Sequence, residues 1–153
     1  MKRPNYSKEK GARAETGARD ILRKYTGLNW ERVPLSGALD PKHGLKSDLY
    51  VPNANNLFCV EVKHYADDHL NSSILTSKNP QLIQFWEQTI REAVQVNKEP
   101  ILIFKHDRSK FFVAFKEFPN GTYDYVYIQY AKHEFYIALL ELWLINEAPK
   151  FTT

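Results

Sequence analysis

Apolar positions follow the helical repeat in three separate segments of the chain, and each segment predicts a helix. The first runs over about 7–24, where the residues of the apolar stripe are Ala14, Ala18, Ile21 and Leu22. Gly27 and Asn29 should end this helix. A second helix should lie between Pro80 and Glu99, on a stripe of Leu82, Ile83, Trp86, Ile90, Ala93 and Val94. The third, about 132–146, is apolar nearly all round, which favours a buried or dimeric setting.

Shorter apolar or alternating runs between these helices predict strands. They lie at about 30–36, 45–52, 57–65, 101–105, 110–116 and 123–130. The predicted order is helix, three strands, helix, two or three strands, helix. This order is typical of an α/β fold in which helices flank a mixed central β-sheet. We expect one domain over residues 8–153, preceded by a flexible basic arm at residues 1–7.

The segment Asn53-Ala-Asn-Asn between two of these strands predicts a hairpin. If these four residues form the whole loop, Pro52 faces Leu57 and Asp48 faces Glu61 across an antiparallel pair. The two carboxylates then share one face of the sheet, with β-carbons roughly 4.5–5.5 Å apart. Lys63 lies two residues beyond Glu61, so strand alternation places it on the same face. The hairpin therefore predicts a cluster of two acids and one base.

Two facing carboxylates repel each other unless a cation or basic groups lie between them. Oxygen ligands suit Mg²⁺, for which Mn²⁺ can substitute, whereas zinc favours histidine and cysteine. A cation held there can activate water toward a phosphodiester, with Lys63 orienting the water or offsetting the developing charge. A lone Glu-x-Lys on a strand usually marks only an exposed sheet face. The facing Asp48 and a basic surround favour phosphodiester hydrolysis instead.

Positive charge is concentrated in the first third of the chain, although the net charge of the whole is only +3. Residues 1–46 contain eleven Lys and Arg residues against five acids. The ordinary interpretation is a solvated helix face and a frayed arm. With the predicted hydrolytic site, the same charge becomes a set of candidate DNA phosphate contacts: Lys2, Arg3, Lys8, Lys10, Arg13, Arg32, Lys42 and Lys46.

Several classes of protein are disfavoured by the composition. Cys59 is the only cysteine, which excludes an intrachain disulfide and a multi-cysteine zinc site. No uninterrupted apolar stretch reaches membrane-spanning length, and the first ten residues lack the apolar segment of a signal peptide. We expect a cytoplasmic, DNA-associated protein with no membrane partner.

The motifs resemble, in order, those of the archaeal-type Holliday junction resolvases of the PD-(D/E)XK nuclease superfamily. They are Lys10-Gly-Ala-Arg-Ala-Glu15 at a helix start, Ser36-Gly37 after a strand, Ser47-Asp48, and Val60-Glu61-Val62-Lys63. The resemblance spans about residues 8–116 and implies a restriction-endonuclease-like fold. The loop at 37–46 and the tail after Phe115 are not matched by it.

The resemblance also implies a role for each matched residue. Asp48 and Glu61 bind the metal, assisted by the carbonyl of Val62, and Glu15 completes the site. Lys63 serves the nucleophilic water, and Ser36 lies near the scissile phosphate. The implied protein is a homodimer that nicks two opposing strands of a four-way DNA junction.

Other functions fit the same residues. A nuclease of this fold could act on linear duplex DNA, in restriction or repair, and a non-catalytic DNA-binding protein could keep the fold alone. The full set of Glu15, Asp48, Glu61 and Lys63 argues against the non-catalytic protein. Gln84 and Gln88, on the second predicted helix, are candidates for polar residues beside the site, although solvent exposure is their ordinary position.

Overall fold

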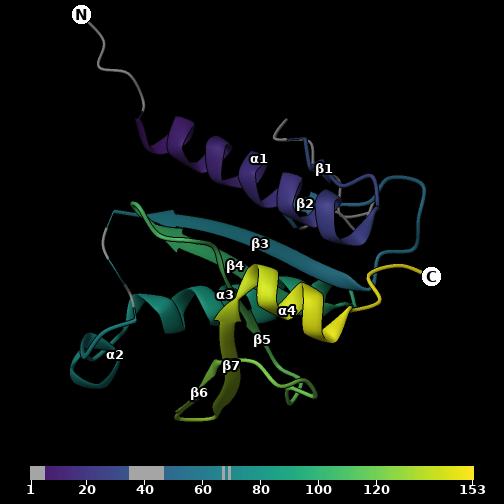
Figure 1. Ribbon diagram of the computed structural model, residues 1–153. Coiled ribbons are helices and arrows are strands. Elements are labelled where there is room, and N and C mark those ends of the chain that lie inside the picture. Colours follow the sequence, from purple (N-terminus) through teal and green to yellow (C-terminus); the bar gives the residue numbers. More distant parts are fainter. Residues whose placement is uncertain (1–5, 35–46, 67, 69) are drawn as a thin grey trace, which may run out of the picture.

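The centre of the molecule is a seven-stranded mixed sheet with helices on both faces, as Figure 1 shows for a computed structural model. The structure describes residues 6–34, 47–66, 68 and 70–153. Strand order is β1-β2-β3-β4-β5-β7-β6; β3 and β4 are parallel, and the other neighbours are antiparallel. The strands are β1 (Glu31–Arg32), β2 (Leu49–Tyr50), β3 (Phe58–Tyr65), β4 (Glu99–His106), β5 (Phe112–Phe115), β6 (Tyr125–Tyr130) and β7 (His133–Leu139). The predicted mixed sheet flanked by helices is confirmed.

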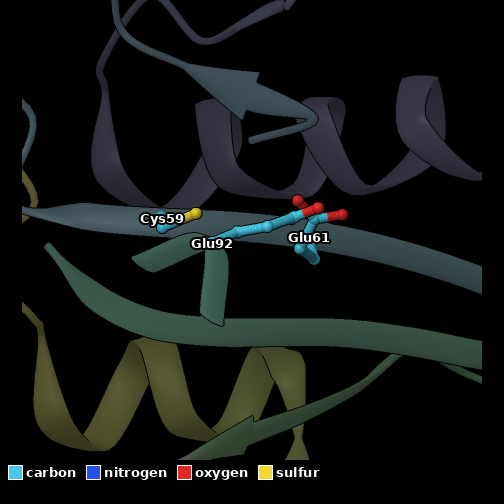
Figure 2. A group of neighbouring side chains, drawn as sticks. All are labelled: Cys59, Glu61 and Glu92. Carbon is cyan, nitrogen blue, oxygen red and sulfur yellow. The ribbon is translucent and has the colours of Figure 1, made fainter. Parts of the chain in front are cut away.

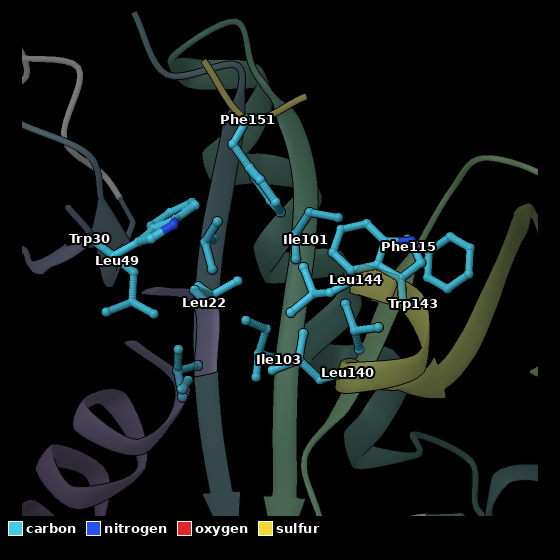
Figure 3. Close-up of a cluster of buried hydrophobic side chains, with 14 of the residues drawn as sticks. Leu22, Trp30, Leu49, Ile101, Ile103, Phe115, Leu140, Trp143, Leu144 and Phe151 are labelled. Carbon is cyan, nitrogen blue, oxygen red and sulfur yellow. The ribbon is translucent and has the colours of Figure 1, made fainter. Parts of the chain in front are cut away.

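Helices cover the two faces of the sheet unequally. The helices are α1 (Tyr6–Thr26), α2 (Ser73–Thr76), α3 (Gln81–Gln95) and α4 (Leu140–Glu147). Helices α1 and α4 share one face, where they bury a core that includes Leu22, Leu49, Ile103 and Leu140 (Figure 3). Helix α3 covers the other face with Leu82, Ile83 and Trp86. Among the described helices, none combines the length and hydrophobicity needed to cross a bilayer.

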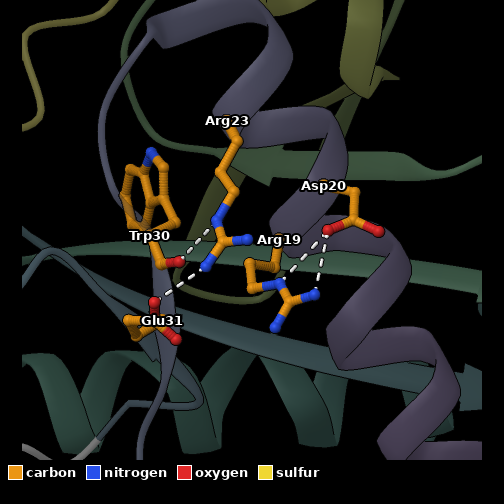
Figure 4. Close-up of polar contacts among 5 residues, drawn as sticks. All are labelled: Arg19, Asp20, Arg23, Trp30 and Glu31. Atoms are coloured by element: carbon orange, nitrogen blue, oxygen red, sulfur yellow. Dashed lines mark hydrogen bonds and ion pairs between the residues drawn. The ribbon is translucent and has the colours of Figure 1, made fainter.

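Helix α1 ends where the sequence predicts, at a glycine. Gly27 has a φ of 72° and donates its N–H to the Arg23 carbonyl at 3.0 Å, which is the usual left-handed cap. Arg23 then donates to the Trp30 carbonyl and to Glu31, both at 2.8 Å (Figure 4). These bonds hold β1 against the end of the helix. At its other end α1 begins at Tyr6, so residues 6 and 7 of the predicted arm are helical. Residues 1–5 lie outside the described part of the chain.

The hairpin of β2 and β3 has the predicted register but a shorter first strand. Leu49 pairs with Val60, the same alignment that sets Asp48 opposite Glu61. The Asn56 side chain accepts from the Val51 N–H and donates to the Val51 carbonyl, both at 2.8 Å. Because an amide side chain takes the backbone groups of Val51, the ladder does not continue beyond Tyr50. Of the predicted strand 45–52, the structure describes residues 47–52, and among these β2 comprises only Leu49 and Tyr50.

The C-terminal third differs from its prediction. The helix expected at 132–146 is a strand, β7, followed by the short helix α4. Both faces of β7 meet other residues, since Phe135 and Ile137 pack toward α3 and Ala138 packs toward α1 and α4. Because residues 135–139 are covered on both faces, this part of β7 is a continuous run of apolar and aromatic residues, without the alternation that distinguishes a strand from a buried helix. Its turn, through Ala131 at a φ of 52°, also lacks the usual Asn-Gly signal.

The last residues of the chain return to the site-bearing hairpin. Phe151 is 3% exposed and packs its ring within 5.0–5.9 Å of the rings of Trp30, Phe58 and Trp143 (centroid distances; Figure 3). Leu57 donates its N–H to the Phe151 carbonyl at 2.8 Å. The tail therefore closes the α1 side of the core and fixes the loop between β2 and β3.

Replacing Phe151 with alanine should destabilise the protein by about 3–5 kcal/mol, because it leaves a cavity among three aromatic rings. Urea unfolding followed by fluorescence measures the change. The neighbouring exposed Lys150 provides the control, since Lys150→Ala should stay within about 0.5 kcal/mol of the parent. An equal, small effect of both substitutions would show that the tail is not part of the core.

Candidate active site

Four carboxylates from α1, β3, α3 and the residue before β2 form a chain of contacts. Glu15 lies on α1, Asp48 directly before β2, Glu61 on β3 and Glu92 on α3. Glu61 interacts with both Asp48 and Glu92, and Glu15 interacts with Asp48. The chain of acids thus crosses from the α1 side of the sheet to the α3 side, with Glu61 at its centre.

The position of Asp48 is set by two hydrogen bonds to β3. Its backbone N–H donates to the Val60 carbonyl at 2.8 Å, and its side-chain Oδ2 accepts from the Val62 N–H at 2.7 Å. Directly before β2 begins, the Asp48 carboxylate therefore takes the place of a backbone carbonyl as the acceptor for the Val62 N–H. This is how the short strand still holds Asp48 beside Glu61.

Glu61 is the most buried acid of the group, at 4% exposure. Its pKa is raised above the ordinary value, first because burial disfavours its charge, then through its contacts with Glu92 and Asp48. Burial, together with the charges of Glu61 and Glu92, also raises the pKa of the Cys59 thiol to about 12. The positive charge of Lys98 lowers the pKa of Cys59 and offsets only part of this rise.

Glu15 forms an ion pair with an arginine of β1. Arg32 donates to Glu15 Oε2 through Nη2 at 2.8 Å and through Nε at 3.1 Å. The pKa of Glu15 is nevertheless raised, because burial and the nearby charge of Asp48 outweigh the effect of Arg32. Arg32, predicted to contact DNA, forms an ion pair with a carboxylate of the site in this structure.

Lys63 lies two residues along β3 from Glu61, as strand alternation requires. Its ammonium is 5.5 Å from the centre of the Phe85 ring of α3, a cation–π distance. The ammonium is therefore supported by α3, the same helix that carries Glu92. Glu61-Val62-Lys63 has the order acid, any residue, lysine that the resemblance in sequence rests on.

Glu92 was missed by sequence reasoning, which considered Gln84 and Gln88 on this helix. Gln84 is exposed and donates to the Asn79 carbonyl at 2.8 Å, away from the acids. Gln88 does approach the site, because its Nε2 lies 3.2 Å from Glu92 Oε1. The available signal was the position of Glu92 directly before Ala93, at the border of the buried stripe, where a charged residue is unusual.

The remaining predicted DNA contacts have varied surroundings. Lys10 forms an ion pair with Asp107 at 2.7 Å, and Asp107 also contacts His64 at 2.9 Å. Arg13 is exposed on α1. Five predicted site residues lie outside the described residues, namely Lys2, Arg3, Ser36, Lys42 and Lys46; of Lys8 only the helical backbone is described.

Comparison with known proteins assigns this arrangement to a family. Residues 6–142 match the model of the family described as "Phage putative PDDEXK endonuclease". The chain is 47% identical to Protein D14 of Escherichia phage T5 over 111 residues. The matched region covers 71% of this chain and 69% of that protein.

The chain belongs to this family of phage PD-(D/E)XK endonucleases. It is thus a nuclease, which agrees with the predicted superfamily and with phosphodiester hydrolysis as its reaction class. Among solved structures, it is similar to Hjc of Archaeoglobus fulgidus, a Holliday junction resolvase. That similarity has a TM-score of 0.43 and 16% sequence identity, over 89% of this chain and 93% of the resolvase.

The site of this endonuclease fits a divalent cation of the kind that its family uses. Glu92 Oε2 is buried without a hydrogen-bond partner in the described structure, and Glu15, Asp48 and Glu61 add further carboxylate oxygens. Hard cations such as Mg²⁺ prefer these ligands. Asp48 and Glu61 would hold such an ion, with Glu15 next to them.

The raised pKa of Glu61 predicts a pH dependence of stability for the metal-free protein. The folded state keeps a proton on Glu61 above the ordinary pKa of 4.5, whereas the unfolded chain loses it. Stability should therefore fall as pH rises from about 6 to about 9, by up to about 1.4 kcal/mol per pH unit. Glu61→Gln should reduce this slope, as measured by urea unfolding in chelator.

The exposed Glu117 supplies the control, because Glu117→Gln should keep the parental slope. Glu15 is unchanged in both Glu61→Gln and Glu117→Gln, so any contribution that it makes to the pH slope of stability cancels when the two variants are compared. A Glu61→Gln protein with an unchanged slope would mean that this carboxyl ionises normally in the folded state.

Proposed function

We propose that this protein is a Mg²⁺-dependent, intracellular DNA endonuclease that resolves four-way junctions as a homodimer, with residues 8–153 acting as one nuclease domain. The observation that carries the metal-dependent part is the buried carboxylate of Glu61, which is 4% exposed and interacts with two further acids, Asp48 and Glu92. The junction preference is supported by the order of motifs around Glu15, Ser36, Asp48 and Glu61-Val62-Lys63, which resembles that of the junction resolvases.

Each residue has a proposed role that its surroundings support. Asp48 and Glu61 bind the cation, with the Val62 carbonyl as a further oxygen ligand. The hydrogen bond from the Val62 N–H to Asp48 keeps these two ligands in register. When bound, the cation supplies Lewis-acid chemistry to the phosphodiester.

The positively charged groups act on the substrate side of the site. Lys63, supported by the Phe85 ring, orients the attacking water or offsets charge on the phosphate. Arg32 keeps Glu15 in place beside Asp48. Ser36 acts near the scissile phosphate, and cations of the arm and of α1 contact neighbouring phosphates.

Cleavage of a labelled four-way junction tests the proposal. With Mg²⁺ the protein should cut the junction into two nicked duplexes by paired incisions, and a linear duplex of the same sequence should be cut much more slowly. Chelator should abolish cutting. Equal cutting of both substrates would favour a restriction or repair nuclease, and binding without cutting would favour a non-catalytic DNA-binding protein.

Asp48→Asn and Glu61→Gln should each lower the cleavage rate at least about 100-fold while leaving junction binding intact, because each change removes a ligand charge and little volume. Single-turnover cleavage and gel-shift titration measure the two effects. Glu117→Gln, at an exposed position, should cut at the parental rate. Retained turnover in either site variant would place the active site elsewhere.

Neutralising Lys2, Arg3 and Lys8 should weaken junction binding mainly through salt dependence. The slope of log affinity against log salt should fall by about 0.9 for each cation that contacts a phosphate. Lys116 and Lys132 are exposed at the other end of the sheet and serve as the matched control. An unchanged slope in the first variant would exclude the arm from the DNA interface.

A further inference from the structure

A stripe of amide side chains and one arginine runs along the outer face of α3. Its members share one side of the helix because they are three or four residues apart. They are Gln81, Gln84, Gln88, Arg91 and Gln95; Gln88 is half-buried and the other four are exposed. No acid interrupts the stripe. Exposed glutamines are common on helices, so this spacing alone does not indicate a ligand.

The surface of α3 is hollowed along the middle of this stripe. A groove of about 300 Å³ is lined by six residues, which are Asn79, Gln84, Phe85, Glu87, Gln88 and Arg91. The acid among them, Glu87, lies beside β7, where its Oε1 is 3.7 Å from His133 Nε2. The rest of the lining presents amides, an aromatic ring and a guanidinium group.

The groove is continuous with the candidate active site through two of its lining residues. The centre of the Phe85 ring is 5.5 Å from the Lys63 ammonium. Gln88 donates to Glu92 Oε1 at 3.2 Å, and the Glu92 side chain reaches from α3 to Glu61 on β3 (Figure 2). A ligand that extends from Lys63 along α3 would therefore enter this groove.

Arg91 is the one cation among the six lining residues. It is exposed and forms no ion pair with any residue that the structure describes. By contrast, Arg19, Arg23 and Arg32 are each paired with a carboxylate. The Arg91 guanidinium is therefore available to an anionic ligand, and its planar shape suits two parallel hydrogen bonds to a phosphate.

We propose that this groove holds the sugar–phosphate backbone of the DNA strand next to the scissile phosphate. Arg91 binds one phosphate, and the amides of Gln84 and Gln88 donate to neighbouring backbone oxygens. Each amide nitrogen carries two hydrogens, of which the bonds to the Asn79 carbonyl and to Glu92 use one apiece. The stretch from Gln84 to Arg91 spans about 10 Å, or about three nucleotides at roughly 3.4 Å per step.

The lining favours a nucleic acid over a second copy of this chain. The centre of a protein–protein interface is apolar, whereas this groove offers one aromatic ring among amides and a cation. Amides donate to phosphate oxygens and add no charge that would repel a polyanion. The proposal rests on the proposed function, because it takes Asp48 and Glu61 as the place of cleavage.

The salt dependence of DNA binding tests the role of Arg91. Arg91→Gln should reduce the slope of log affinity against log salt by about 0.7–0.9, because one phosphate contact is lost. Arg91→Lys keeps the charge and should keep the slope. Fluorescence anisotropy in chelator, with a labelled four-way junction and a labelled linear duplex, measures this slope without cleavage.

Lys116→Gln is the matched control for Arg91→Gln. Lys116 is exposed directly after β5, at the end of the sheet where β4 begins, and its replacement should leave the parental slope. An unchanged slope in Arg91→Gln on both DNAs overturns the proposal.

Gln84→Glu tests the stripe by adding a negative charge with almost no change of shape. It should weaken DNA binding at least about threefold at low salt, because the new carboxylate faces a phosphate. Gln129→Glu, at an exposed position on the edge strand β6, changes the net charge equally and should bind nearly as the parent does.

Urea unfolding and sedimentation establish that both glutamate variants fold and keep the parental oligomeric state. Equal weakening by the two substitutions would show that only net charge matters. Weakening of Gln84→Glu together with an altered oligomeric state would assign this face of α3 to protein contact. Either result overturns the proposal.

A disulfide cross-link locates the strand directly. Cys59 is the only native cysteine and is completely buried, so Arg91→Cys supplies the reactive thiol. This variant should couple to DNA that carries a thiol tether on a phosphate beside the cleavage point, whereas Lys116→Cys should not. Equal coupling from both positions, or none from position 91 for any tethered phosphate near the cut, overturns the proposal.

Failure here is distinguishable from failure of the proposed function. If Asp48→Asn abolishes cleavage and Arg91→Gln keeps the parental slope, the nuclease site stands and the groove is wrong. If Arg91→Gln reduces the slope on both DNAs while junction and duplex are cut equally, the groove stands and the junction preference is wrong.

Discussion

The burial of an uncompensated carboxylate on a central strand is the constraint on which the site depends. Glu61 lies on β3, which has α1 on one face and α3 on the other, so it is withdrawn from water. Its nearest polar neighbours include Asp48 and Glu92, which are also acids. A protein folds around such a group only if something positive or a proton occupies the space, because unpaired buried charge costs several kcal/mol. That requirement makes a cation-dependent function physically reasonable here.

Contacts at both ends of the hairpin keep the buried carboxylate of Glu61 in place. The hydrogen bond between Asp48 and the Val62 N–H holds one end of the hairpin, and Asn56 with the C-terminal tail holds the other. Strand β2 is only two residues long, so these side-chain and tail contacts replace the backbone ladder that a longer strand would provide. The site is thus positioned by contacts that are far apart in the sequence.

Helices α1 and α3 contribute differently to the chemistry. Helix α1 brings Glu15, whose charge is partly balanced by Arg32. Helix α3 brings Glu92 without a balancing donor for its second oxygen, and also the aromatic ring beneath Lys63. On the α3 side of the site, the negative charge is therefore less well balanced than on the α1 side. A bound cation would stabilise the α3 side most.

The sequence alone determined what depends on local spacing. Helical periodicity with a terminal glycine predicted α1, and an asparagine-rich four-residue link predicted the register that sets Asp48 opposite Glu61. These features depend on residues close together in the chain, so pattern and turn chemistry suffice. The motif order was enough to indicate a nuclease of the PD-(D/E)XK superfamily, in agreement with the family match.

Only the tertiary structure decided the features that depend on what covers each element. Strand β7 was predicted as part of a helix because burial on both faces removes the alternation that marks a strand. The contact between Arg32 and Glu15, seventeen residues earlier in the chain, likewise exists only because β1 packs beside α1. Glu92 joined the site because α3 packs on β3, thirty-one residues from Glu61. No local pattern encodes a carboxylate pair at that separation, since it exists only once the helix and strand have packed together.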